Sequence, residues 1–206
     1  MTLETKHWPG RLIAFEGIDG TGKSTQVRLL AEELSHRGHR VVMTREPTDG
    51  PFGQRIRRLY TDRDSVSRQE ELELFVADRR QHVGQLILPA LAAGKVVITD
   101  RYYYSTAAYQ GAAGLDPQEI IRRNEEFAPQ PDLVILLDLD PARGVDRIRN
   151  SRNQELNAFE QEEALARVAA IFNRLQGAHI QRLDADRSVA QVHAEVLQHV
   201  QLLFKG

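Results

Sequence analysis

Residues 11–25 read RLIAFEGIDGTGKST, and this stretch decides the fold. The apolar run at its start predicts a short strand, Arg11–Glu16, and an amphipathic helical pattern begins at Lys23. Between them the residues fit the pattern G-x-x-x-x-G-K-[ST]. Glycines let successive N–H groups converge on phosphate oxygens, and the positive end of the following helix attracts the same charge. The stretch therefore predicts a phosphate-binding loop in an α/β domain; a glycine-rich turn without a ligand is the alternative.

The composition describes an ordinary soluble protein. The chain has 206 residues with 27 Lys+Arg against 29 Asp+Glu, no cysteine, and a polar start, MTLETKHWPG, without an apolar signal-peptide core. A formal charge of −2 argues against non-specific binding to nucleic acid or to an anionic membrane. We expect a single domain over residues 1–206 that is cytoplasmic, with no nucleic-acid partner and no membrane association.

Short apolar runs alternate with longer amphipathic stretches along the chain. The predicted strands are Arg11–Glu16, Arg40–Met43, Lys95–Thr99, Asp132–Leu137 and His179–Leu183. The predicted helices are Lys23–Arg37, Ser67–Ala93, Pro117–Glu126, Glu160–Gln176 and Ser188–Phe204, with Gly38, Gly94 and Gly177 expected just after helix ends. Continuous apolar runs such as KVVITD suit strands buried on both faces, so the alternation predicts a mostly parallel sheet flanked by helices.

The phosphate loop alone does not identify the reaction. Lys23 can reach the outer phosphates of a nucleotide, and the Ser24 hydroxyl can ligate Mg²⁺. No N-K-x-D segment for guanine is found, and neither Asp100 nor Asp138 is followed by the glutamate typical of motor ATPases. Instead Arg101 follows Asp100, at the strand end where ligands of α/β sheets bind.

Four segments in order resemble the thymidylate kinase family: GIDGTGKST at 17–25, TREP at 44–47, LFVADRR at 74–80 and DRYYYSTAAYQG at 100–111. The resemblance spans nearly the whole chain. It implies a P-loop fold with a five-stranded parallel core, a short lid at about 147–160, Mg²⁺-dependent phosphoryl transfer from ATP to dTMP, and a homodimer. It also implies that ATP is bound by the loop residues Gly17, Ile18, Asp19, Gly20, Thr21, Gly22, Lys23, Ser24 and Thr25.

Asp19 and Arg45 are expected to hold the acceptor nucleotide. The resemblance has Asp19 accept a hydrogen bond from the sugar 3′-hydroxyl or help to hold the metal; a carboxylate that only closes the turn is the alternative. Arg45, just beyond a strand end, can grip the acceptor phosphate with its planar fork, or form a surface salt bridge. The residues TDGPFG that follow TREP depart from the GGT of many relatives.

Phe75 and Arg79 are four residues apart and so share one face of a helix. By the resemblance the ring of Phe75 stacks on thymine and the guanidinium of Arg79 hydrogen-bonds to O4 of the base. From the residues alone, Phe75 could equally belong to the core and Arg79 to a solvated charged face.

The segment that begins at Asp100 carries the most information. Asp100 can organise Mg²⁺, and Arg101 can neutralise charge between the acceptor and donor phosphates. By the resemblance Thr106 contacts the base near N3 and O4, Tyr109 crowds C2′ of the sugar, and Gln110 lines the same pocket. The three tyrosines Tyr102–Tyr104 are expected to pack beneath the loop instead.

The lid is expected to supply further cations. Gly20 stands where one branch of the family carries a basic residue, so the chain is similar to the branch that uses lid arginines, with Arg149 and Arg152 expected to reach ATP. Arg147 is a third candidate, and a solvated turn of helix is the alternative for each. Glu160 is expected in the pocket or near the metal, while Asn157–Ala158 depart from the family's Asp–Arg.

These observations leave three hypotheses. The first is a dTMP kinase that uses Lys23, Arg101, Arg149 and Arg152 for transfer and Ser24 and Asp100 for Mg²⁺. The second is a nucleoside kinase, or a nucleotide kinase with a different base preference. The third is a nucleotide-binding regulator without catalytic activity.

Overall fold

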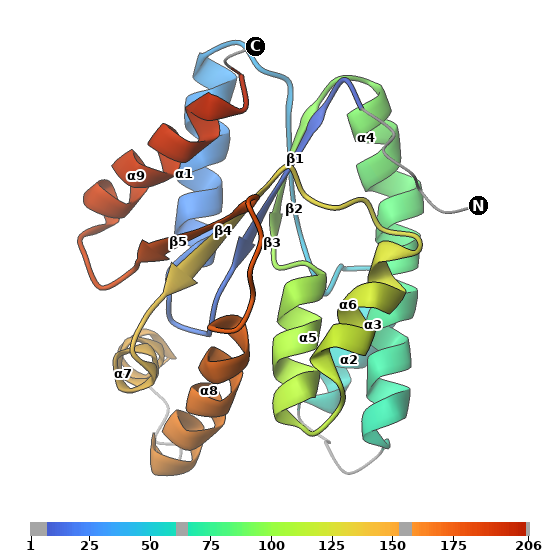
Figure 1. Ribbon diagram of the computed structural model, residues 1–206, viewed down its shortest axis with the longest axis vertical. Helices are drawn as coiled ribbons and strands as arrows, with labels where there is room; N and C mark the ends of the chain where they lie inside the picture. The colour runs from blue at the N-terminus through green and yellow to red at the C-terminus, as the bar shows by residue number, and fades with distance from the viewer. Residues whose placement is uncertain (1–7, 61–65, 153–157, 205–206) are drawn as a thin grey trace.

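The computed structural model describes residues 8–60, 66–152 and 158–204, without the side chains of 150–152 and 158–160. Its centre is a parallel sheet in the order β2-β3-β1-β4-β5 (Figure 1). The strands are β1 (Arg11–Glu16), β2 (Val41–Arg45), β3 (Val96–Asp100), β4 (Leu133–Asp138) and β5 (Ile180–Asp184). Each predicted strand is therefore confirmed to within two residues at either end.

The helices form a layer on each face of this sheet. They are α1 (Lys23–His36), α2 (Pro51–Leu59), α3 (Arg68–His82), the π-helix η2 (Val83–Ile87), α4 (Leu88–Ala92), α5 (Tyr103–Ala112), α6 (Pro117–Glu125), α7 (Pro141–Arg152), α8 (Ala158–Phe172) and α9 (Val189–Leu202). Among the described residues, no helix combines the length and apolar character needed to cross a bilayer. The predicted three-layer α/β architecture is confirmed.

Alternate residues of the strands feed two separate cores. Leu12 and Ala14 of β1 pack with η2, α4, α5 and α8 on one face, whereas Ile13 and Phe15 pack with α1 and α9 on the other (Figure 1). All four side chains are fully buried, as are most of β3 and β4. Burial on both faces explains why these strands read as continuous apolar runs.

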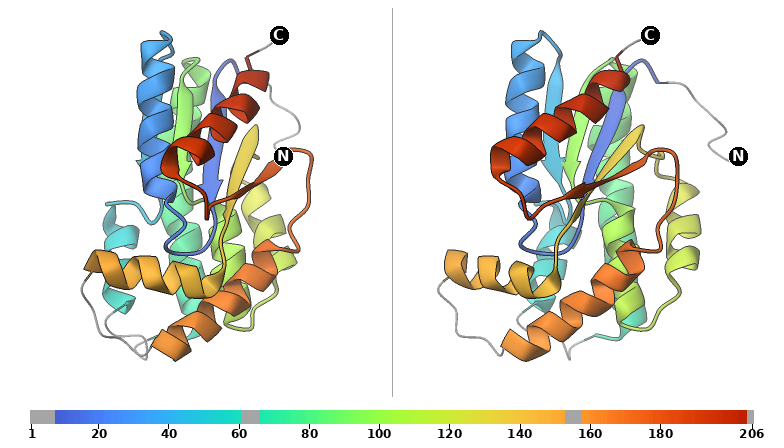
Figure 2. Two further views of the ribbon diagram at one scale, coloured as in Figure 1. Left: turned by 90° about the vertical axis from the view of Figure 1, so that its left-hand side faces the viewer. Right: turned by 60° about the vertical axis from the view of Figure 1, so that its left-hand side comes forward.

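The register of the strands gathers polar groups at one edge. Phe15 of β1 and Arg45 of β2 both pair with Asp100 of β3, and Asp138 of β4 pairs with Asp184 of β5. The phosphate loop, α7 and α8 lie beyond these carboxyl ends (Figure 2). This edge is where parallel sheets bind ligands.

Three helices were not expected from the sequence. α2 starts at a proline and is only nine residues long. α5 is buried around most of its circumference, so its sequence shows no polar face. α7 starts at Pro141, where the Asp140 carboxylate accepts from the N–H of Ala142 at 2.9 Å.

Two predicted helix ends need correction. The stretch Ser67–Ala93 is not one regular helix, because the π-helix η2 interrupts it directly before Pro89, which has no N–H to donate. Gly38 and Gly94 follow helix ends with φ of 86° and 68°, as expected. Gly177 does not, because α8 already ends at Phe172 and this glycine has no positive φ.

The contact of α2 with the loop before it depends on a missing side chain. A Cβ on Gly53 would lie 1.9 Å from the carbonyl oxygen of Thr48, whereas a Cβ on Gly84 in η2 would meet nothing within 4 Å. We expect Gly53→Ala to lower the free energy of unfolding by about 2 kcal/mol because backbone must move. Gly84→Ala should leave it unchanged or raise it by up to about 1 kcal/mol. Urea denaturation measures both, and equal effects of the two substitutions would contradict the close contact.

Candidate active site

The phosphate loop joins β1 to α1 through three glycines in a backbone conformation that other residues rarely adopt. Gly17, Gly20 and Gly22 all have positive φ, at 134°, 85° and 88°. A Cβ on Gly17 would lie 2.4 Å from the carbonyl oxygen of Leu137, and one on Gly20 would lie 2.5 Å from that of Gly144. The loop is thus pressed between the end of β4 and the start of α7, which fixes its path.

Lys23 is folded back into this loop. Its Nζ donates to the carbonyl oxygens of Ile18 at 2.7 Å and Gly17 at 3.1 Å, and to the hydroxyl of Thr21 at 3.2 Å. Burial and the nearby Arg101 guanidinium together lower the pKa of Lys23 to about 7, against the opposing effect of Asp19, Asp100 and Glu16. An anion in the loop would raise the pKa of this ammonium in the same way as these carboxylates do.

Ser24 and Asp100 form the candidate metal pair. The hydroxyl of Ser24, in the first turn of α1, donates to the carboxylate of Asp100 at the end of β3. Oxygen donors of this kind suit Mg²⁺, which keeps several waters and is completed by substrate phosphates. Among the described residues no three His, Cys, Asp or Glu side chains cluster as a metal site.

Arg101 lies against the phosphate loop in an unusual backbone conformation, with φ of 72°. Its guanidinium donates to Asp19 at 2.7 Å and to the Ser105 hydroxyl at 2.9 Å, and lies 5.0 Å from the centre of the Tyr109 ring. Although burial works the other way, the charges of Arg101 and Lys23 hold the pKa of Asp19 below its usual value. The structure therefore brings Asp19, Arg101 and Tyr109, three of the predicted residues, into direct contact.

Glu16 is a residue of this region that sequence reasoning missed. Its fully buried carboxylate accepts from the N–H groups of Tyr102 at 2.9 Å and Ser105 at 3.1 Å, and from the Ser105 hydroxyl. Burial raises the pKa of Glu16 to about 7, against the opposing effect of these donors and of Arg101. The acid thus caps the start of α5 and holds the serine that contacts Arg101. A carboxylate at the end of a buried apolar strand was the available signal.

Arg45 lies at the same edge but pairs with a neighbour. Its guanidinium is 2.8 Å from the carboxylate of Asp49, which also receives Arg57 of α2 at 3.1 Å. The pair is well exposed, and exposed pairs contribute about 0–1 kcal/mol, so an incoming phosphate can displace it. In this structure Arg45 forms a surface salt bridge, which is the alternative that the sequence analysis gave for it.

Arg79 is buried rather than solvated. It is 1 % exposed and contacts Glu46 of the TREP segment, Asn124 of α6 and the hydroxyl of Thr106 on α5. Phe75, one turn before it on α3, is half-buried and packs against a small cluster around Ile56. Of the two interpretations of Arg79, the structure rules out the solvated charged face.

Gln110 carries an unsatisfied acceptor. It lies one turn after Thr106 on α5, so the two side chains share a face of the helix. Its Oε1 is buried without a hydrogen-bond partner in the structure. Buried polar atoms are nearly always paired, and one that is not points to a missing ligand or water.

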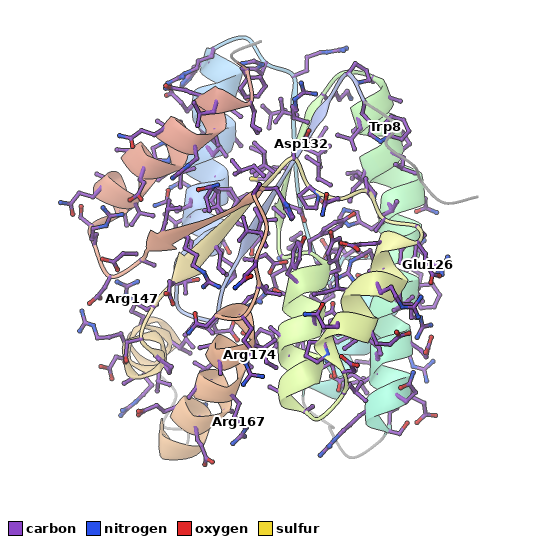
Figure 3. All side chains as sticks on the ribbon, viewed as in Figure 1. Trp8, Glu126, Asp132, Arg147, Arg167 and Arg174 are labelled. Atoms are coloured by element: carbon purple, nitrogen blue, oxygen red, sulfur yellow. The ribbon has the colours of Figure 1, made fainter. Side chains whose placement is uncertain are left out.

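The predicted lid divides between α7 and α8. Arg147 donates to the carbonyl oxygen of Ala185 at 2.9 Å and reaches that of Gly20 at 3.5 Å, on the side of α7 nearest the sheet (Figure 3). Arg149 is exposed. The side chains of Arg152 and Glu160 lie outside the described part of the chain, so their predicted roles stay predictions.

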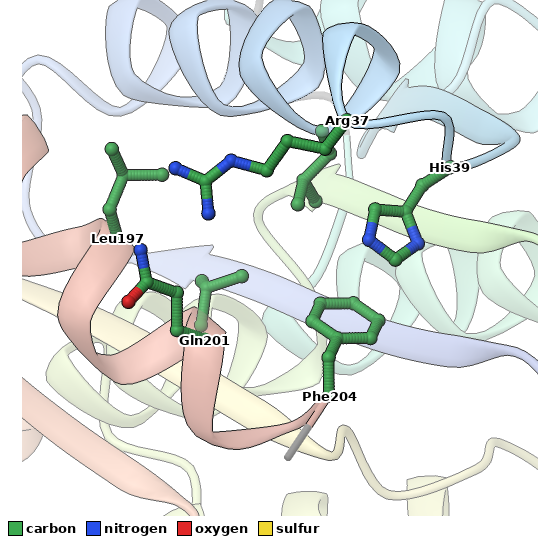
Figure 4. Close-up of a pocket in the computed structure, with 7 residues that line it drawn as sticks. Arg37, His39, Leu197, Gln201 and Phe204 are labelled. Atoms are coloured by element: carbon green, nitrogen blue, oxygen red, sulfur yellow. The ribbon is translucent and has the colours of Figure 1, made fainter.

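One hollow of the structure lies far from this edge. It measures about 400 Å³ and is lined by residues in and directly after α1 and α9 that include Arg37, Leu197 and Phe204 (Figure 4). Arg37 follows the C-terminal end of α1, about 20 Å along the helix from the phosphate loop. The hollow therefore takes no part in the candidate active site.

Arg101 lies against the loop after β1, and Arg45 lies at the same edge of the sheet. These features are those of a P-loop protein built like the nucleotide kinases. The comparisons with known proteins agree. The family model described as thymidylate kinase matches residues 15–196, and the chain belongs to the thymidylate kinase family.

Two relatives show how closely it matches. A protein of Desulfotalea psychrophila named thymidylate kinase is 53% identical over 197 residues, covering 96% of this chain and 97% of the relative. One of the same name from Xanthomonas campestris is 49% identical over 192 residues, covering 91% of this chain and 83% of the relative.

The raised pKa of Glu16 makes stability depend on pH. The folded protein holds the proton of Glu16 more tightly than the unfolded chain does. The contribution of Glu16 to the free energy of unfolding is therefore fully present below pH 4.5 and is lost as the pH rises through about 7. A shift of this size corresponds to about 3 kcal/mol. Glu16→Gln keeps an oxygen for the two N–H groups and has no charge to bury. We expect the free energy of unfolding of the variant, relative to that of the wild type, to rise by up to about 3 kcal/mol from pH 5 to pH 8.

Urea denaturation at both pH values measures this difference. Glu119→Gln, at an exposed position on α6, is the matched control. Its free energy of unfolding should equal that of the wild type at both pH values. A difference between Glu16→Gln and the wild type that stays constant with pH would show that the carboxyl is not desolvated as described.

Proposed function

We propose that the chain transfers the γ-phosphoryl group of ATP to dTMP, giving ADP and dTDP. The observation that carries the proposal is the contact of Arg101 with Asp19, because it holds a guanidinium over the phosphate loop. Two anionic nucleotides brought end to end repel each other, and a fixed cation between them lowers that cost most as charge moves in the transition state.

The loop residues 17–25 are proposed to bind ATP, and the Lys23 ammonium to leave its carbonyl partners for the outer phosphates. The acceptor phosphate is itself a nucleophile at neutral pH, so the proposal assigns no general base. Arg45 is proposed to hold the acceptor phosphate, and Asp19 the sugar. Arg149 and Arg152 of the lid are proposed to reach ATP, as the resemblance implies.

Two side chains proposed to form the base pocket suit thymine. The hydroxyl of Thr106 can donate to a carbonyl such as O4, and the unpaired Oε1 of Gln110 can accept from an N–H such as N3–H. Phe75 is proposed to stack on the base and Tyr109 to exclude a ribose 2′-hydroxyl. Cytosine has no N–H at N3, so the Oε1 acceptor of Gln110 favours a thymidylate over a cytidylate acceptor.

Ser24 and Asp100 are proposed to hold Mg²⁺, and Glu160 to lie near the metal or the pocket. A bound Mg²⁺ would neutralise charge on the phosphates of ATP. Asp100 and Ser24 already hold each other in place, so the ion would replace a hydrogen bond rather than order two free side chains. The homodimer, the cytoplasmic location and the lid at 147–160 complete the proposal and rest on the sequence.

An acceptor panel tests the proposed substrate. With ATP and Mg²⁺ we expect ADP release to depend on dTMP and to exceed that with dCMP, AMP or GMP by at least about 10²-fold, because buried polar groups reject mismatched bases. Thymidine should be inactive, since Arg45 and Arg101 call for a phosphate. Equal rates with all monophosphates would reject the base pocket, and ATP binding without acceptor-dependent ADP release would favour a regulator.

Removal of either central cation tests the transfer step. We expect Lys23→Ala and Arg101→Ala each to lower kcat by about 10²–10³-fold, because each contacts developing charge. Arg122→Ala is the matched control, since it removes an exposed arginine that pairs with Glu119 on α6, and it should leave kcat unchanged. Wild-type turnover in a folded Arg101→Ala variant would contradict the assigned role.

A further inference from the structure

The segment that carries Arg45 is held against α3 by the residues around it. The contacts are Thr44 with His82, Glu46 with Arg79 and His82, and Thr48 with Asp78. The three side chains of α3 are buried, and His82 is the last residue of the helix. The side chain of Arg45 is exposed and pairs with Asp49 instead. The position of Arg45 is therefore set by its neighbours in the chain.

His82 contacts the residues on both sides of Arg45. Its Nε2 lies 2.7 Å from the hydroxyl of Thr44, and its Nδ1 lies 2.9 Å from Oε1 of Glu46. Although burial works the other way, Arg79 and the hydrogen bond to His82 hold the pKa of Glu46 below its usual value, so Glu46 is a carboxylate. A carboxylate only accepts hydrogen bonds, and Nδ1 of His82 is therefore the donor.

The second ring nitrogen keeps its partner in either charge state of the imidazole. In a neutral ring Nε2 accepts the hydrogen of the Thr44 hydroxyl, and in a charged ring Nε2 donates to the oxygen of the same hydroxyl. Both nitrogens of His82 thus hold the chain, one residue before and one residue after Arg45.

Support from α3 matters here because β2 lies at an edge of the sheet. The strand order gives β2 one neighbouring strand, β3, with which Arg45 pairs through Asp100. The side chain of Arg45 is 63 % exposed, and an exposed ion pair such as that with Asp49 contributes about 0–1 kcal/mol. The direction in which the guanidinium points therefore depends on the backbone that His82 holds.

We propose that His82 is a positioning residue for the acceptor phosphate: through Thr44 and Glu46 it fixes the backbone of Arg45, so that the guanidinium meets the phosphate of the acceptor nucleotide. The inference rests on the proposed function, which assigns this phosphate to Arg45. In this role His82 acts through Arg45 and does not touch the nucleotide.

Binding of dTMP and of thymidine tests this role, because the two ligands differ only in the phosphate. In His82→Ala we expect the Kd of dTMP to rise by at least about tenfold, since a misplaced guanidinium loses a charged hydrogen bond. The Kd of thymidine should change by less than about twofold, because Arg79 contacts the other oxygen of Glu46, Oε2, and keeps it. Titration calorimetry measures both constants, and in turnover assays the KM for dTMP should rise while that for ATP stays constant.

Partial replacements test the two contacts of His82 separately. The amide of His82→Asn can take the place of Nδ1 beside Glu46, and that of His82→Gln can take the place of Nε2 beside Thr44. Each should give a Kd for dTMP between those of the wild type and His82→Ala. Thr44→Val removes the hydroxyl and keeps the shape of the side chain, and it should raise the Kd of dTMP by at least about threefold without changing that of thymidine.

Val83→Ala is the matched control. It removes buried atoms from the residue next to His82, but Val83 belongs to the core that contains Leu12 and Ala14. Both dissociation constants should equal those of the wild type. A rise in the Kd of dTMP as large as that in His82→Ala would show that any disturbance of this part of the chain has the effect, and would overturn the proposal.

A double-mutant cycle asks whether His82 acts through Arg45. Arg45→Ala removes the proposed phosphate contact. In this background His82→Ala should change the Kd of dTMP by less than about twofold, because the group that it positions is absent. A full further loss would show that His82 acts by another route.

The outcomes separate the inference from the function on which it rests. Absence of dTMP-dependent ADP release by the wild type would reject the proposed function. An active wild type, with an unchanged Kd of dTMP or an equal loss for thymidine in a folded His82→Ala variant, would reject the inference alone. If His82→Ala does not fold, Thr44→Val takes its place with the expectation given above.

Discussion

One buried carboxylate ties the two halves of the candidate site together. Glu16 ends the central strand β1, directly before the phosphate loop, and caps the helix that follows Arg101. The backbone of Arg101 is held from both sides as well, because its N–H donates to the carbonyl of Phe15 and its carbonyl accepts from Thr99. The geometry between loop and guanidinium is therefore set by contacts within the protein core. Preorganisation of this kind is what electrostatic catalysis requires, since no charge then has to be moved into place during the reaction.

The cations of the site have partners within the protein before a nucleotide arrives. Lys23 and Arg101 face Asp19, Asp100 and Glu16, and Arg45 faces Asp49. Each cation thus contacts an acceptor of the protein: Lys23 donates to backbone carbonyls, Arg101 pairs with Asp19, and Arg45 pairs with Asp49. Binding of anionic substrates exchanges these partners rather than burying new uncompensated charge, which limits the desolvation cost.

The sequence was sufficient for the sheet and for the phosphate loop, because both depend on local patterns. Apolar runs that are buried on two faces, and glycines followed by lysine and serine, can be recognised within a few residues. The helix α5 was missed because its burial leaves no polar face, and the break of the long helix at η2 because one proline was its only sign. The family resemblance placed Arg79 near the base, but Glu46 and Asn124 lie 33 and 45 residues from it in the chain. Residues so far apart in the sequence are brought together only when the chain folds, so no local pattern predicts their contact.

The contact between Gly20 and Gly144 has a consequence for how such sites diversify. The carbonyl of Gly144 occupies the space where any side chain at position 20 would begin. A Cβ on Gly144 would in turn lie 2.9 Å from the carbonyl oxygen of Asp19. A basic residue in the loop thus requires the first turn of α7 to withdraw at the same time. In this chain the position of α7 therefore excludes a side chain at position 20, and a substitution there has to be accompanied by a change in the first turn of α7.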